Sequence, residues 1–278
     1  MSFEYLGKNY IPACYVKFLE SSGARAVPIF NNLTEVETKK LFESINGAVF
    51  PGGIVNVSTS GYANISRTIL KLAKKTFDEG GYFPIIGMCL GHQILATLVN
   101  GPTDIRIRTD SLNMIAPLNL PKNYRDSKLF RSLSKDLMKT FNKTLITTHA
   151  HELGLPLELF RENKTLDQFY KVITTNVDRN GVEFVSTMEA KKYPFYSMQW
   201  HPEKPPFEWN PEKVIPHFSA STELSQYISN FFVNEARFSK HKFASRKEER
   251  AALIYNHNPT YIAGINEHSI FEQVYLFD

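Results

Sequence analysis

A cysteine between two glycines is the first pattern in this sequence that could support catalysis. In FPIIGMCLGHQ, residues 83–93, a short apolar run ends at Gly87, and Cys89 and Gly91 follow it. After Gly91 the apolar residues recur at the spacing of a helix. A strand, a tight glycine turn and a helix form a nucleophile elbow, which projects the side chain at its apex. The helix N-terminus favours a thiolate, and the Leu90 N–H would face a developing oxyanion. The alternative is a small buried hydrophobic cysteine.

A histidine and a carboxylate follow far downstream, in MQWHPE at 198–203. A thiolate nucleophile needs an acid that protonates the leaving nitrogen. A histidine can be this acid when a carboxylate fixes its orientation and the position of its hydrogen. His201 with Glu203 supplies this pair, although the segment alone equally fits a polar surface loop. Upstream, FPGG at 50–53 offers the Gly53 N–H as a second oxyanion donor, or forms an ordinary turn.

Helix-like and strand-like segments alternate over the first hundred residues. This order and the continuously apolar strands predict an α/β three-layer sandwich, with a mostly parallel central sheet, helices on both faces and antiparallel strands at the edge. We find no linker and expect one domain over residues 1–278. The predicted helices are 11–22, 34–45 (with Thr34 and Glu37 as a capping box), 63–81, 91–101 and 221–238 (capped by Ser221 or Thr222). The predicted strands are 26–30, 47–53, 82–88 and, at the edge, 144–150, 169–177, 182–189 and 194–200.

Composition excludes several classes of function. The net charge is +4 and no basic patch is interleaved with aromatic residues, so we expect no nucleic-acid partner. No apolar run approaches the roughly 20 residues of a membrane span, so we expect no membrane partner. Cys14 and Cys89 lack metal-ligand spacing, which predicts no metal site and leaves a disulfide between them open.

Signals for cellular location disagree. The first residues, MSFEYLGKNY, contain no apolar signal-peptide core, which predicts a cytosolic chain if Met1 is the true start. A group of N-glycosylation sequons instead indicates a secretory history. These sequons are at Asn32, Asn56, Asn64, Asn142 and Asn163.

Together, GxCxGxQ, PGG and HPE resemble the class I glutamine amidotransferase-like superfamily. Segments along nearly the whole chain, chiefly EFVSTMEAKKYP, QWHPEKPPFEW and FFVNEAR, resemble the gamma-glutamyl hydrolase family within it. This resemblance implies a cysteine peptidase acting on gamma-glutamyl bonds, chiefly in folate poly-gamma-glutamates, without a cofactor. It also implies a homodimer in the lysosome or outside the cell. By position, the implied roles are nucleophile for Cys89, acid/base for His201, orienting partner for Glu203, and substrate cleft for Tyr15 and His151.

Two departures from the family pattern keep alternatives open. The family has a strand of the PIIGIL kind before the position where this sequence starts; its absence would expose a sheet edge, and the chain could then be an inactive or binding homologue. His92 and Gln93 stand where the family often has an aromatic and an acidic residue, and glutaminases resemble this chain there. A glutaminase is therefore the alternative enzyme, although no synthase domain is fused to the chain.

Overall fold

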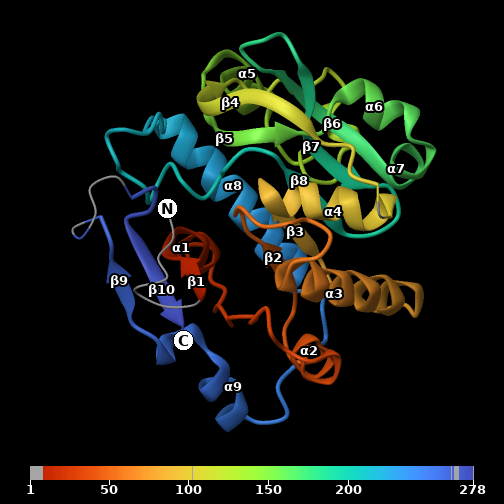
Figure 1. Ribbon diagram of the computed structural model, residues 1–278, viewed down its shortest axis with the longest axis vertical. Helices are drawn as coiled ribbons and strands as arrows, with labels where there is room; N and C mark the ends of the chain where they lie inside the picture. Colours follow the sequence, from red (N-terminus) through yellow and green to blue (C-terminus); the bar gives the residue numbers. More distant parts are fainter. Residues whose placement is uncertain (1–8, 102, 264, 266–268, 278) are drawn as a thin grey trace.

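The computed structural model describes residues 9–101, 103–263, 265 and 269–277 (Figure 1). The strands are β1 (Asn9–Pro12), β2 (Ala48–Phe50), β3 (Ile85–Met88), β4 (Ile107–Ala116), β5 (Thr147–Gly154), β6 (Tyr170–Val177), β7 (Glu183–Ala190), β8 (Phe195–Met198), β9 (Pro259–Tyr261) and β10 (Gln273–Phe277). The α-helices are α1 (Ala13–Glu20), α2 (Glu35–Phe42), α3 (Gly61–Asp78), α4 (Leu90–Asn100), α5 (Lys135–Lys143), α6 (Leu157–Glu162), α7 (Lys164–Phe169), α8 (Ser219–Ala236) and α9 (Arg246–Ala252). Two short 3-10 helices span Tyr124–Asp126 and Ile254–Asn256.

A central sheet carries the segments that the sequence marks for chemistry. Its strand order is β2-β3-β8-β7-β6. The β2–β3 and β3–β8 pairs are parallel, whereas β8–β7 and β7–β6 are antiparallel. The predicted α/β fold with antiparallel strands toward one edge is confirmed. Because β2, β3 and β8 run in the same direction, the segments that follow them meet at one edge of the sheet.

Side chains that alternate along β3 and β8 build a core on each face of this sheet. Ile85 and Phe195 pack into the cluster beneath α3, α4 and α7. Ile86 and Tyr196, one residue further on, pack into the cluster with α1 and α8. All four are fully buried, and each buried isoleucine contributes roughly 1.5–3 kcal/mol to folding. Helices therefore cover both faces, which gives the three layers.

Two smaller sheets flank the central one. Strands β1, β10 and β9 pair antiparallel beside α1, so the two ends of the described chain lie together (Figure 1). Val274 of β10 is fully buried, and the Phe277 ring packs edge-on against Phe30, so the aromatic tail docks on the body. At the opposite end of the molecule, β4 and β5 pair antiparallel, with Ser111 opposite His151.

Three sequence predictions about elements are wrong, and one strand was missed. Residues 26–30 form no strand: the Ala26 carbonyl accepts a hydrogen bond from Ile254 N–H, and the segment packs beside α1 without a strand partner. The strand at 144–150 becomes β5, which pairs with β4 and not with the central sheet, and β4 itself was not predicted. Helix α8 begins at Ser219 with Phe218 at the N-cap, so neither Ser221 nor Thr222 caps it.

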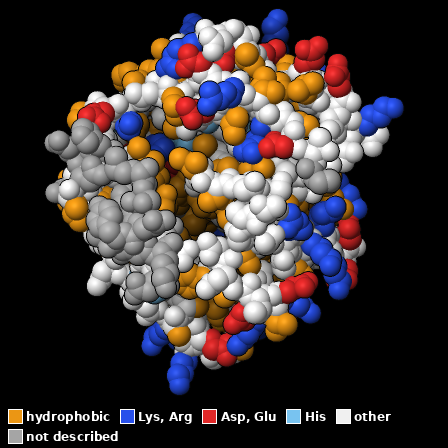
Figure 2. Space-filling model, in the orientation of Figure 1, with side chains coloured by type: hydrophobic (Ala, Val, Ile, Leu, Met, Phe, Trp, Pro, Cys, Tyr) orange, Lys and Arg blue, Asp and Glu red, His pale blue; other side chains and the backbone are white. Residues whose placement is uncertain are grey.

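The surface is mixed in charge. Basic and acidic side chains are interspersed over the face drawn in Figure 2. Within the described residues, none of the helices is both long and apolar enough to cross a bilayer.

The capping box predicted from Thr34 and Glu37 is present at α2 and is testable. The Thr34 hydroxyl accepts from Glu37 N–H, and the Glu37 carboxylate accepts from Thr34 N–H at 2.8 Å. We expect Thr34→Ala to lower the free energy of unfolding by about 1 kcal/mol, because an N–H of the first turn loses its acceptor. Chemical denaturation measures this. Thr68→Ala, in the middle of α3, should change stability by less than about 0.5 kcal/mol; equal effects would contradict the capping explanation.

Candidate active site

Cys89 lies at the apex of a strained turn between β3 and α4. Its backbone has φ 52° and ψ −107°, a region that residues with a side chain rarely adopt. A hydrogen bond from Cys89 N–H to Met198 O, at 2.8 Å, ties the turn to the end of β8. The N–H groups of Leu90 and the next residues open α4 and have no intrahelical acceptor. The predicted nucleophile elbow is present in this geometry.

The two glycines allow three backbones to meet around Cys89. A Cβ on Gly91 would lie 2.0 Å from the Phe50 carbonyl oxygen at the end of β2. A Cβ on Gly87 would lie 2.7 Å from the Gly91 backbone. Real Cβ atoms do not approach other atoms this closely, so both positions require glycine. The pattern G-x-C-x-G therefore reflects a close approach of β2, β3 and α4.

His201 and Glu203 form a buried pair beside Cys89. His201 Nδ1 lies 2.6 Å from Glu203 Oε1, and the ring also interacts with the Cys89 side chain. Burial acts to lower the pKa of His201, but the charges of Glu203 and Cys89 outweigh it and raise the pKa to about 9. Burial acts to raise the pKa of Glu203, and the His201 charge holds it below its ordinary value. His201 is thus a cation at neutral pH.

Two tyrosines hold the turn that follows β2. The Gly52 N–H donates to the Tyr15 hydroxyl at 2.7 Å, and the Tyr62 hydroxyl donates to Pro51 O at 2.8 Å. A Cβ on Gly52 would lie 2.9 Å from the Tyr15 hydroxyl and 3.0 Å from His201 Cε1. Tyr15 therefore contacts this turn, beside the position where a substrate cleft was expected.

Gly53 follows in the same turn and is exposed, and a Cβ on it would lie 3.3 Å from Leu90 Cδ2. The turn that carries Gly53 therefore packs against the side chain of Leu90. Sequence reasoning missed Gly52 and Tyr62; the doubled glycine of PGG was the available signal for the first.

His151 lies on β5, buried, with both ring nitrogens engaged by the protein. Its Nδ1 is 3.0 Å from Leu153 O and 3.2 Å from Thr109 Oγ1, and its Nε2 is 3.2 Å from His149 Nδ1. Burial first, and then the His201 charge, lower the pKa of His151 to about 3. His151 therefore sits near the candidate site as a neutral ring, and His149 beside it was not identified from sequence.

The side chains of His92 and Gln93 are both buried in the protein interior. His92 is fully buried, with Nδ1 2.8 Å from Ser197 Oγ, and burial lowers its pKa to about 3. The Gln93 amide nitrogen donates to Leu153 O at 2.7 Å, and its oxygen accepts from Arg106 at 2.9 Å. Both side chains are therefore buried and hydrogen-bonded to other parts of the protein.

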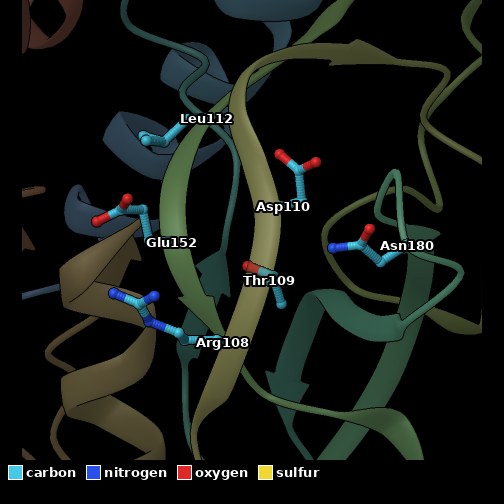
Figure 3. A pocket seen from close by; sticks show the side chains of 6 residues that line it. All are labelled: Arg108, Thr109, Asp110, Leu112, Glu152 and Asn180. Atoms are coloured by element: carbon cyan, nitrogen blue, oxygen red, sulfur yellow. The ribbon is translucent and has the colours of Figure 1, made fainter.

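A polar hollow of about 270 Å³ lies next to His151, where β4 and β5 meet the turn after β6 (Figure 3). Arg108 and Glu152 lie on one side of the paired strands and Asp110 on the other, and Asn180 points toward β4 from the turn after β6. Thr109, which also lines the hollow, contacts His151.

Cys14 and Cys89 are both free thiols, so the disulfide left open by the sequence is absent. Within the described chain, no group of three or more His, Cys, Asp or Glu side chains is arranged to hold a metal ion.

Comparison with known proteins agrees with this geometry. The family model "Glutamine amidotransferase class-I" matches residues 15–219. Gamma-glutamyl hydrolase of Bos taurus is 44% identical over 98% of this chain and 84% of its own length. The protein belongs to the gamma-glutamyl hydrolase family. The human gamma-glutamyl hydrolase is 42% identical over the same shares, and gamma-glutamyl hydrolase B of Dictyostelium discoideum is 37% identical over 98% of this chain and 78% of its own length.

A solved structure supports the fold alone. A putative GMP synthase protein from Thermoplasma acidophilum superposes with a TM-score of 0.50 at 14% identity, over 85% of this chain and 90% of that one. The superfamily suggested by GxCxGxQ, PGG and HPE is confirmed by the family model, and the hydrolase family suggested by the longer segments is confirmed by the sequence relatives.

The close approach at Gly91 predicts a large loss of stability on substitution. We expect Gly91→Ala to lower the free energy of unfolding by about 3 kcal/mol or more, because the new Cβ meets a backbone oxygen that cannot move aside. Thermal and chemical denaturation measure the loss. In Gly53→Ala the new Cβ would meet only the end of the Leu90 side chain, and we expect a change within about 1 kcal/mol. Similar stability of both variants would contradict the packing argument.

The His201–Glu203 pair predicts a pH dependence. In Glu203→Gln the amide carries no charge, so the pKa of His201 should fall from about 9, and the protonated ring should be lost at lower pH. We expect the alkaline limb of kcat/KM to move down by about one pH unit or more. Glu43→Gln, at the exposed end of α2, should leave the limb in place. An unchanged limb in Glu203→Gln would show that Glu203 does not set the His201 charge.

Proposed function

We propose that this protein hydrolyses gamma-glutamyl amide bonds with Cys89 as nucleophile. The observation that carries the proposal is the strained turn that places Cys89 against the buried His201–Glu203 pair. Similarity to gamma-glutamyl hydrolases along 98% of the chain supports the choice of reaction.

The reaction proceeds through a thioester. The Cys89 thiolate attacks the gamma-carbonyl carbon, and the carbonyl electron pair moves to an oxyanion that accepts hydrogen bonds from the N–H groups of Gly53 and Leu90. As the carbon–nitrogen bond breaks, His201 gives its proton to the leaving amine. His201 then takes a proton from water, whose oxygen attacks the thioester and releases the gamma-carboxylate and the thiolate. Glu203 holds the His201 ring through Nδ1, so Nε2 faces the reacting atoms.

Tyr15 and His151 belong to the walls of this site in the proposal. Tyr15 acts through the turn it holds, because its hydroxyl accepts the Gly52 N–H immediately before the oxyanion donor Gly53. Burial raises the pKa of Tyr15 well above its ordinary value, so the phenol stays neutral. His151 is a neutral neighbour of the acid, with no ring nitrogen free for substrate in this conformation.

The substrate class is folate poly-gamma-glutamates, by resemblance to the family. In the same way we propose one catalytic domain over residues 1–278, a homodimer, and a lysosomal or secreted location. Of the sequons, Asn32, Asn56 and Asn64 are exposed and suit glycosylation. The amide nitrogens of Asn142 and Asn163 instead donate to Leu120 O and to Asn100.

The deciding experiment is Cys89→Ala assayed on a poly-gamma-glutamyl folate and on free glutamine. We expect the unchanged protein to cleave the gamma-glutamyl chain in preference to glutamine. We expect Cys89→Ala to lose at least about a thousandfold in kcat/KM, because no other group can form the thioester. Chromatography of released glutamate and an ammonia assay measure the two reactions.

Cys14→Ala is the matched control, since Cys14 is the other cysteine of the chain and is also buried. It should keep its activity, and a thiol-reactive substrate analogue should still label Cys89. Undiminished hydrolysis by Cys89→Ala would overturn the assignment, and preferential ammonia release from glutamine would replace the hydrolase with a glutaminase.

A further inference from the structure

One face of β5 connects the segment that carries His201 with the polar hollow. The His201 N–H donates to the Thr148 carbonyl oxygen at 2.9 Å, which joins that segment to β5. Thr148, Ala150 and Glu152 are separated by two residues, so their side chains lie on the same face of the strand. Thr148 is buried, whereas Ala150 and Glu152 are exposed. This face therefore leads outward from His201 to the hollow.

The distance along this face suits a chain-like substrate. At about 3.3 Å per residue, Glu152 lies roughly 13 Å along β5 from Thr148. A gamma-linked glutamyl unit has two more chain carbons than an alpha-linked residue, so it spans roughly 6 Å when extended. The hollow is thus about two glutamyl units away from the bond that His201 would help to break.

Two oppositely charged side chains lie at the outer end of this face. Arg108 of β4 and Glu152 are exposed and lie on the same side of the paired strands (Figure 3). Arg108 is opposite Leu153 in the strand register, one residue from Glu152. Within the part of the chain that the structure describes, neither charged side chain makes a hydrogen bond or an ion pair. Both groups are therefore available to a ligand.

The carboxylates on the other side of β4 already have partners within the protein. Asp110 forms an ion pair with Arg179 at 2.9 Å. Asp178 is buried and accepts the Asp110 N–H at 2.7 Å, together with two N–H groups of its own turn. These bonds fix the turn after β6 against β4, so the strand that carries Arg108 is held in place.

Each unit of a poly-gamma-glutamate chain carries groups that complement this face. Its alpha-carbon bears a carboxylate and an amide N–H, and two methylenes follow. The Arg108 guanidinium suits a carboxylate, because its planar fork can donate two parallel hydrogen bonds. An ionised carboxylate only accepts, so Glu152 suits the N–H. Leu112 is 46% exposed and lies on the same side of the strands, where it suits the methylenes.

We propose that Arg108 and Glu152 form a subsite for a glutamyl unit remote from the scissile bond, in which Arg108 binds the alpha-carboxylate and Glu152 accepts the N–H attached to the same alpha-carbon. The inference rests on the proposed function, because it names the part of that substrate which this face binds. The subsite raises kcat/KM for long poly-gamma-glutamates over short ones, since only long chains reach it.

Chain length separates this subsite from the catalytic groups. The test compares a folate that carries two glutamates, with one gamma bond to cleave, and a folate that carries five. We expect Arg108→Gln to lose about tenfold in kcat/KM on the five-glutamate substrate, mainly through KM, and to stay within about twofold on the two-glutamate substrate. Arg108→Lys should lose less, because the charge remains while the fork is lost. Arg161→Gln, at an exposed arginine of α6, is the matched control and should change neither rate.

Glu152→Ala distinguishes a subsite from simple attraction between charges. The subsite loses an acceptor, so we expect kcat/KM to fall about threefold or more on the five-glutamate substrate and to stay unchanged on the two-glutamate substrate. If only the net charge of this face acted, removal of an anion would raise kcat/KM for the acidic chain. Such a gain would overturn the inference, as would an Arg108→Gln loss that is absent or equal on both substrates.

The proposed function can fail separately from this inference. Hydrolysis of both substrates by Cys89→Ala removes the nucleophile, whereas a loss in Arg108→Gln that grows with chain length would remain. An Arg108→Gln variant that treats both substrates as the unchanged protein does removes the subsite and leaves the nucleophile in place.

Discussion

The backbone of Cys89 is the constraint on which the site depends. A residue with a side chain is held at a positive φ because β3 ends there and α4 begins one residue later. The surrounding backbones leave no room to relax: Gly91 lies against the end of β2, and Cys89 N–H is bonded to the end of β8. Strain of this kind persists only where packing on all sides over-determines it. The core on both faces of the sheet thus fixes where the sulfur points.

Of the histidines around that sulfur, only His201 is charged at neutral pH. His201 and Glu203 are both removed from water, and a buried pair is stable only when the partners are close and oriented. The other rings near it, His92, His149 and His151, are kept neutral by burial, and the His201 charge opposes a second cation at His149 and His151. In the proposed mechanism, His201 is therefore the one charged ring among these histidines that can give a proton to the leaving amine.

Local signals in the chain predicted the parts of the structure that depend on neighbours in sequence. Strand, glycine turn and helix around Cys89 follow from a few consecutive residues, as does the capping box at Thr34. The pairing of His201 with Glu203 also lies within one short segment. The strand expected at 26–30 failed because a strand needs a partner across space, and apolar composition does not supply one. For the same reason β5 was placed in the wrong sheet, since nothing in its residues identifies β4 as its neighbour.

The sequence by itself determined the turn at Cys89, the pairing of His201 with Glu203 and the gamma-glutamyl hydrolase family, because each is recognised from short stretches of consecutive residues of distinctive type. Only the tertiary structure decided how Tyr15 and Tyr62 hold the turn after β2 and how the Gln93 amide is hydrogen-bonded by Arg106 and Leu153. It also decided that both nitrogens of His151 are engaged. These contacts join residues that are far apart in the chain or depend on backbone carbonyls, which every residue carries. Because every residue has the same backbone carbonyl, the sequence does not indicate which carbonyl accepts a given hydrogen bond, and only the folded structure shows it.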